Sequence, residues 1–282
     1  MAILEEIPGI EVTVQVNGRN AIEYDDPHAS EQESAADSPT SCRYIESIDD
    51  AEFSVSVVAT SRYTWRHHHA FRATLYADGQ RVGKKVMKES SSDNRITIEG
   101  RHHFDMKKQQ WYLQHFKFAA ISTVDDSNQD RVQRDKELAA RLGIIEVRLR
   151  RVRVLGRLPV SSHHSRGCQP QAKHELSEKS LKGKAISHGV DFSSNEIDAS
   201  VRGSSRISYI PGEKEHFGVY RFYYRSKDAL RQELIIPRSP SPAHNISGLS
   251  RAEIERLARE RLRQIKVCQS LPLVGKMQDH FT

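Results

Sequence analysis

The strongest constraint on the fold is an alternation of apolar and polar residues that recurs along the first half of the chain. Residues 10–16 read Ile-Glu-Val-Thr-Val-Gln-Val, the pattern of a strand that is buried on one face. Because about eight such strands occur without alternating helices, we predict a mainly β fold, an antiparallel β-sandwich or jelly roll. Further short strands are expected near 53–57, 71–75, 82–86, 96–98, 110–118, 145–149, 207–209 and 217–224.

Local signals refine this plan at two places. Asp78-Gly79 is a strong signal for a tight hairpin turn. Residues 131–142 predict a short helix that Gly143 ends. In the strand that follows, the apolar positions change parity after Leu149, so we expect a β-bulge near Arg150-Arg151.

The composition changes along the chain and predicts its organisation. Residues 156–200 lose all periodicity and are rich in Ser, His, Lys and Gln, which is typical of a flexible insertion. Ser250-Arg251-Ala252-Glu253 is a helix capping box. We predict one β-sandwich domain (1–236) with an acidic loop (24–40) and the flexible insertion (156–200), then a Pro/Ser linker (237–249), an amphipathic helix (250–268) and a disordered tail (269–282).

Several features bear on the cellular compartment. No segment has 18 consecutive apolar residues, so no membrane-spanning helix is expected. The first residues include Glu5 and Glu6, where a signal peptide would be basic. The three cysteines lie far apart, which favours a reducing compartment. We therefore expect a nuclear or cytoplasmic protein that is neither secreted nor bound to a membrane.

The net charge of +6 conceals an uneven distribution. Residues 1–60 carry 13 acidic and two basic residues, whereas the remainder carries an excess of 17 positive charges. Such a division indicates a polyanionic partner, an acidic protein surface, or pairing between the two parts of this chain. The composition does not choose among the three.

The densest basic cluster lies in and beyond the strand that follows Gly143. Arg148 and Arg150 share one side of the predicted strand, and neighbouring cations could extend a basic stripe that neutralises phosphates. The more ordinary interpretation is a solvated outer face or a partner for the acidic segment, and we favour it. The candidate polyanion-binding residues are Arg148, Arg150, Arg151, Arg153 and Arg157. The aromatic residues Tyr209, Tyr220, Phe222 and Tyr224 are expected in the core rather than on a stacking surface.

Catalytic and metal-binding motifs do not emerge from the sequence. The 14 histidines include consecutive runs, but neighbouring residues on a strand point to opposite faces and make poor joint ligands. No phosphate loop, dinucleotide fingerprint or nucleophile elbow is present. We therefore predict no catalytic residue, no metal and no cofactor. An enzyme with a jelly-roll pocket is the remote alternative, and it would need polar side chains that converge inside the sandwich.

Two serines are candidate phosphorylation sites. Ser239 and Ser241 each precede a proline and follow Arg238 closely, so a phosphate there would lie beside basic sequence. The other interpretation is a linker stiffened by its prolines.

Several ordered segments together resemble a fungal family of domains of unknown function, number 7918, over about residues 5–242. They are Pro8–Val14, Glu23–Asp26, Tyr44–Glu46, Asp78–Gly83, Gly143–Val147, Gly183–Val190 and Phe217–Pro242. The resemblance implies a β-rich intracellular domain with no assigned activity, and it assigns no site residue.

The function that we expect is a non-enzymatic β-sandwich that binds another protein, with mobile charged loops as contacts. The alternative is association with nucleic acid or chromatin through the basic strand at 148–157. The sequence does not indicate which protein is bound or how many copies of the chain associate.

Overall fold

The structure is a computed structural model, and it describes residues 2–27, 38–65, 69–91, 93–126, 128–158, 175–198, 203, 205–237, 255–256 and 259. The chain divides into two compact units, Met1–Pro237 and Arg238–Thr282. Within the described residues, every strand belongs to the first unit.

One large sheet has nine strands and follows the order β1-β2-β6-β11-β10. Four further strands pair with this path, and all the pairings are antiparallel. The strands are β1 (Ala2–Ile3), β2 (Ile10–Val16), β3 (Arg19–Asn20), β6 (Glu52–Ala59), β9 (Arg95–Ile98), β10 (Gly100–Asp105), β11 (Gln110–Ala120), β15 (His188–Phe192) and β16 (Glu196–Ile197).

The other large sheet has seven strands in the order β4-β5-β18-β13-β7-β8, with β17 paired to β13. Its pairings are antiparallel except for β5 with β18, which run parallel. The strands are β4 (Glu23–Asp25), β5 (Thr40–Glu46), β7 (Ala70–Ala77), β8 (Gln80–Lys88), β13 (Ile144–Arg157), β17 (Ser205–Tyr209) and β18 (Gly218–Arg225).

One large cluster of buried hydrophobic residues joins the two sheets. In β2, Val12 and Val14 are fully buried, as are Val147 and Leu149 in β13, and all four belong to one core cluster. The alternation that marks these strands in the sequence therefore turns one face of each sheet inward. The predicted mainly β, sandwich-like fold is confirmed.

The described residues form 18 strands rather than about eight. Several of the additional strands have only two or three residues, which is too short for an alternation to be recognised. Asp78 and Gly79 both have positive φ angles, +51° and +75°, and connect β7 to β8 as the predicted tight turn.

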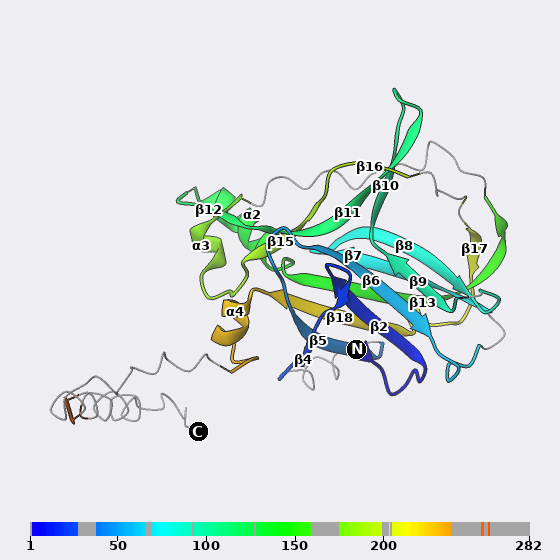
Figure 1. Ribbon diagram of the computed structural model, residues 1–282, viewed down its shortest axis with the longest axis horizontal. Helices are drawn as coiled ribbons and strands as arrows, with labels where there is room; N and C mark the ends of the chain where they lie inside the picture. The colour runs from blue at the N-terminus through cyan, green and yellow to red at the C-terminus, as the bar shows by residue number, and fades with distance from the viewer. Residues whose placement is uncertain are drawn as a thin grey trace, which may run out of the picture. The chain divides into compact units, whose positions relative to one another are not determined.

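The described part of the first unit also contains three helices and a small parallel sheet. They are α2 (Gln129–Ala139), α3 (Glu178–Leu181), α4 (Lys227–Gln232), β12 (Ser122–Val124) and β14 (Glu175–Ser177). Figure 1 shows α2, α3 and β12 gathered at one end of the unit and β17 near the other. The helix predicted near 131–142 is confirmed as α2. However, Leu138 is 53% exposed, and Asp135 and Ala139 are the buried residues of this helix.

The prediction that residues 156–200 form a flexible insertion is wrong for residues 175–198, which include β14, α3, β15 and β16. The strand β15 pairs with β11 and buries Val190. β11 already provides the backbone hydrogen-bonding partners for β15. The five-residue strand therefore needs few buried apolar side chains, and its sequence shows no alternation of apolar and polar residues.

The predicted bulge also lies elsewhere. The pairing of β13 with β7 continues without a shift through Arg150 and Arg151, and the register changes only between Val154 and Gly156, against β17. Val152 is buried although its parity is that of Arg150. β13 continues beyond the sandwich core, and there it pairs with β17. Its buried side chains at that end therefore no longer lie on the face that is buried within the core, and the apolar positions change parity without a bulge.

Several predicted segments lie wholly or partly outside the described residues. These include the centre of the acidic loop (28–37), Ser239 and Ser241, and the tail (269–282). Of the predicted helix 250–268, the structure describes Glu255, Arg256 and Arg259, all helical and exposed. Arg259 forms an i, i+4 ion pair with Glu255 at 3.7 Å.

Candidate functional site

The candidate site is the outer face of the seven-stranded sheet around β13. Since Ile145, Val147 and Leu149 are buried, the alternate residues of this strand point outward. The register places Arg72 of β7 beside Arg150 and Thr74 beside Arg148, with Lys84 of β8 beyond Thr74. We call the set Arg72, Lys84, Arg148, Arg150 and Arg221 the basic face.

Two arginines of the basic face converge on one aromatic ring. The guanidinium carbon of Arg150 lies 3.7 Å from the ring centroid of Tyr209, and that of Arg72 lies 5.2 Å from it. Arg72 Nη1 also donates a 2.6 Å hydrogen bond to the Tyr209 hydroxyl. Tyr209 is 46% exposed, so the expectation that it belongs to the core is wrong. The ring is a surface on which cations stack.

A buried carboxylate organises the centre of the basic face. Glu146 accepts hydrogen bonds from Arg148 Nε at 2.6 Å and from Arg221 Nη2 at 2.7 Å. Burial raises the pKa of Glu146, but the hydrogen bonds from Arg221 and Arg148 outweigh it and hold the pKa below its ordinary value. Arg148 also lies over the ring of Tyr76, 4.5 Å from the centroid. One carboxylate thus fixes two guanidinium groups.

The five predicted arginines do not form one cluster. Arg148 and Arg150 share the basic face, as their alternation predicts. Arg151 is 17% exposed, pairs with Glu213 at 2.8 Å and lies over Phe217 at the rim of the core. Arg153 and Arg157 are exposed on the stretch of β13 that pairs with β17. Polyanion binding by these residues stays a prediction.

The sequence interpretation missed Arg72, Lys84, Arg221 and His216. Arg72 and Arg221 are placed by the pairing of β13 with β7 and β18, Lys84 by the pairing of β7 with β8, and His216 just before β18. No local pattern in the sequence reveals these neighbours. Burial lowers the pKa of the His216 imidazole; Glu215 opposes the shift, and Arg148, Arg150 and Arg72 reinforce it. The carboxylate of Glu215 lies 3.9 Å from Arg150 Nη1, and its side chain is 75% exposed. Among the described residues, the five cationic side chains of the basic face thus lie near the carboxylates of Glu146 and Glu215, which leaves an excess of positive charge.

Two histidines of the other sheet lie beside carboxylates. His102 lies 2.8 Å from Asp198, and His115 lies 3.4 Å from Glu196. Among the residues that the structure describes, no group of three or more His, Cys, Asp or Glu side chains is placed to hold a metal ion. In the same part of the chain, no helix combines the length and the apolar character that crossing a membrane requires.

Comparisons with known proteins give one match. A family model described as "Domain of unknown function (DUF7918)" matches residues 9–239. Neither the curated proteins nor the solved structures contain a match. The matched range starts just before β2 and includes the seven-stranded sheet, the nine-stranded sheet apart from β1, and α4. Because the model covers well over half of its length, the chain belongs to this family of domains of unknown function.

Proposed function

We propose that this chain is a non-enzymatic protein-interaction module of the nucleus or cytoplasm, and that its basic face binds an acidic segment of a partner protein. The observation that carries the proposal is the convergence of Arg72 and Arg150 on Tyr209. Arg72 forms no ion pair with any residue that the structure describes, and its Nε is buried without a hydrogen-bond partner. A carboxylate from a partner would supply the counter-charge that this guanidinium lacks within the described residues.

The contacts of the aromatic rings favour an acidic protein over nucleic acid. Bases bind single-strand readers by stacking on free aromatic faces. Here Arg150 already covers one face of Tyr209, and Arg148 lies over Tyr76. Guanidinium donors suit carboxylates and phosphates alike, so it is the covered aromatic faces that argue against the stacking of bases. Nucleic acid is therefore the alternative that the experiment below tests.

The interior of the sandwich supports a binding role rather than catalysis. Large apolar side chains from both sheets, such as Phe116, Phe118 and Phe222, fill the space between them and are fully buried. A jelly-roll enzyme would place polar groups there to hold a substrate.

The test is a titration of the full chain with a fluorescent poly-glutamate peptide and, separately, with single- and double-stranded oligonucleotides. We expect the peptide to bind and its affinity to fall as salt is added. Arg150→Glu and Arg72→Glu should each weaken peptide binding by about tenfold, which corresponds to ~1.4 kcal/mol. Oligonucleotides should bind more weakly than the peptide at every salt concentration.

The matched control is Arg19→Glu, the same charge change at an exposed position on β3 of the other sheet. It should leave peptide binding unchanged, because β3 lies outside the seven-stranded sheet. Equal losses in Arg19→Glu and Arg150→Glu would show that only the net charge matters and would overturn the proposed site. Tighter binding of oligonucleotides than of the peptide would replace the proposal with the nucleic-acid alternative.

A further inference from the structure

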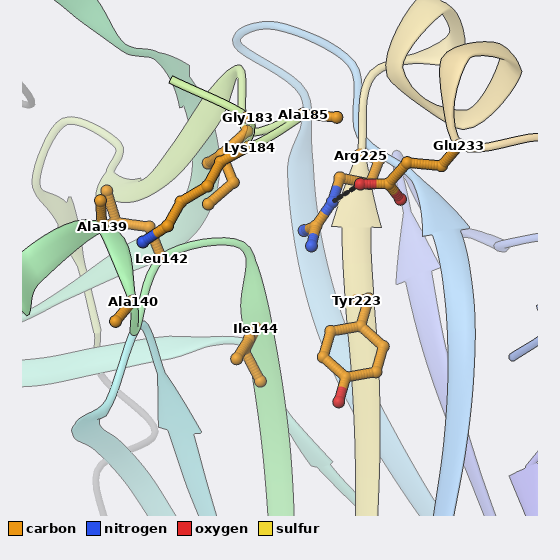
Figure 2. A pocket seen from close by; sticks show the side chains of 11 residues that line it. Ala139, Ala140, Leu142, Ile144, Gly183, Lys184, Ala185, Tyr223, Arg225 and Glu233 are labelled. Atoms are coloured by element: carbon orange, nitrogen blue, oxygen red, sulfur yellow. Dashed lines mark hydrogen bonds and ion pairs between the residues drawn. The ribbon is translucent and has the colours of Figure 1, made fainter. Parts of the chain in front are cut away.

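A separate pocket lies at the end of the seven-stranded sheet near α2 and α4. Its volume is about 300 Å³, which is at the small end of the range for ligand pockets. Ala139, Leu142 and Ile144 supply an apolar wall. Figure 2 shows Lys184 on the side of this wall and Arg225 and Tyr223 on the opposite side. The pocket therefore combines an apolar wall with two cationic side chains.

Arg225 is held firmly but has donors left over. Its Nη1 donates to the carbonyl oxygens of Gly143 and Tyr224, both at 2.9 Å. Its Nε lies 3.4 Å from a carboxylate oxygen of Glu233. The Nη2 group makes no hydrogen bond to the residues that the structure describes. Because the side chain is only 11% exposed, its orientation is fixed before any ligand arrives, which reduces the entropic cost of binding.

Lys184 adds a second positive charge from a short loop. The backbone turns at Gly183, where φ is +78°, and the Lys184 N–H donates to the Leu181 carbonyl at 2.9 Å. The Lys184 side chain is exposed and forms no ion pair within the described part of the chain. Its flexible stem allows the ammonium group to follow a ligand across the pocket. Glu233 also lines the pocket and lies 3.4 Å from Arg225. Two cationic side chains thus stand against one carboxylate among the lining residues, and the net positive charge favours an anion.

We infer that this pocket binds a small organic carboxylate. The carboxylate would accept charge-assisted hydrogen bonds from Arg225 Nη2 and from the Lys184 ammonium group. The apolar body of the ligand would lie against Leu142 and Ile144 and remove their surface from water. Inorganic phosphate would satisfy the cations but not the apolar wall, so it should bind more weakly. This site is distinct from the basic face, because the lining residues contributed by β13 and β18, Ile144, Tyr223 and Arg225, are not among its members.

The experiment is isothermal titration of the full chain with benzoate, with benzamide and inorganic phosphate as comparison ligands. We expect benzoate to bind at least ten times more tightly than either, since benzamide lacks the charge and phosphate lacks the apolar body. Lys184→Gln should weaken benzoate binding by about tenfold. Lys182→Gln, an exposed lysine of the same loop that does not line the pocket, is the matched control and should bind normally.

Two further variants locate the site. Ala140→Phe places a large side chain at the edge of the pocket from an exposed position and should abolish binding without changing the urea midpoint of unfolding. Arg150→Glu alters only the basic face and should leave benzoate binding intact, so the two proposals fail independently. Absence of benzoate binding to the unmodified chain, or binding that survives both Lys184→Gln and Ala140→Phe, would overturn the inference.

Discussion

The hydroxyl of Tyr224 donates a 2.6 Å hydrogen bond to the buried carboxylate of Asp78. The same carboxylate accepts the backbone N–H groups of Gly143 at 2.9 Å and Val190 at 2.8 Å. Val190 lies in β15 of the nine-stranded sheet, whereas Asp78, Gly143 and Tyr224 lie in or beside the seven-stranded sheet. A single turn residue therefore links both sheets of the sandwich.

Asp78→Asn should destabilise the domain by about 2–3 kcal/mol, the cost of leaving a buried donor without its acceptor. Asparagine tolerates the left-handed backbone of the turn, but its amide N–H₂ would replace one acceptor oxygen and meet a backbone donor. The free energy of unfolding in urea measures the change. Asp50→Asn is the matched control. Asp50 also has a positive φ of +55°, but its carboxylate is exposed and forms an ion pair with Lys117. It should cost under ~1 kcal/mol, and equal losses would contradict the role of Asp78.

Tyr224 should make the stability fall at alkaline pH. Burial, with the charge of Asp78 added, raises the pKa of the Tyr224 phenol well above its ordinary value of 10.0. The protonated phenol therefore stabilises the fold fully below pH 10.0, and this contribution is lost as the pH rises from there through the folded-state pKa. We expect the unmodified chain to be more stable than Tyr224→Phe at pH 8. Above pH 10 the difference should shrink by about 1.4 kcal/mol per pH unit. Urea unfolding across this range measures it, and parallel curves would refute the expectation.

Short-range patterns in the sequence predict the turn at Asp78-Gly79, the buried face of β2 and the helix α2. They do not predict the partners of Asp78, because Gly143 and Val190 are 65 and 112 residues away. The strand β15 likewise shows no apolar alternation in its sequence, because its pairing with the distant strand β11 determines its structure. The partners of Asp78 and the strand β15 both depend on contacts between residues far apart in the sequence.

The basic face follows the same rule. The alternation in β13 predicts that Arg148 and Arg150 share a side. Nothing in the sequence indicates that Arg72 lies beside Arg150, because that neighbour depends on the register between β13 and β7. Tyr209 pairs with Val152, in the part of β13 that extends beyond the sandwich core. The exposure of the Tyr209 side chain depends on this pairing and is likewise not predictable from the sequence.

Glu146 should contribute to stability in a way that is lost in acid. The folded-state pKa of Glu146 lies below its ordinary value of 4.5 despite burial, because Arg221 and Arg148 donate to the carboxylate. The contribution is therefore present above pH 4.5 and is lost as the pH falls through the lower folded-state pKa. Glu146→Gln should cost about 2 kcal/mol at pH 7, and its deficit should shrink below pH 4.5. Glu215→Gln, at an exposed carboxylate 3.9 Å from Arg150, should cost under ~0.5 kcal/mol. Urea unfolding at several pH values tests both, and a deficit that does not change with pH would contradict the ionised role of Glu146.

Two glycines with similar backbone angles should respond very differently to alanine. Gly9 (φ +91°) and Gly18 (φ +74°) both adopt a conformation that strains an L residue. At Gly9 an added Cβ would also lie 2.2 Å from the backbone nitrogen of Tyr63, whereas nothing lies within 4 Å of it at Gly18. The Thr60 N–H donates to the Gly9 carbonyl at 2.8 Å and so keeps the backbone around Gly9 close to the segment that contains Tyr63. Gly9→Ala should therefore cost about 3 kcal/mol or more, the sum of strain and a backbone clash, and Gly18→Ala only about 1 kcal/mol. The urea midpoints of the two variants measure this difference, and equal midpoints would show that the chain before β2 moves away from Tyr63 at little cost.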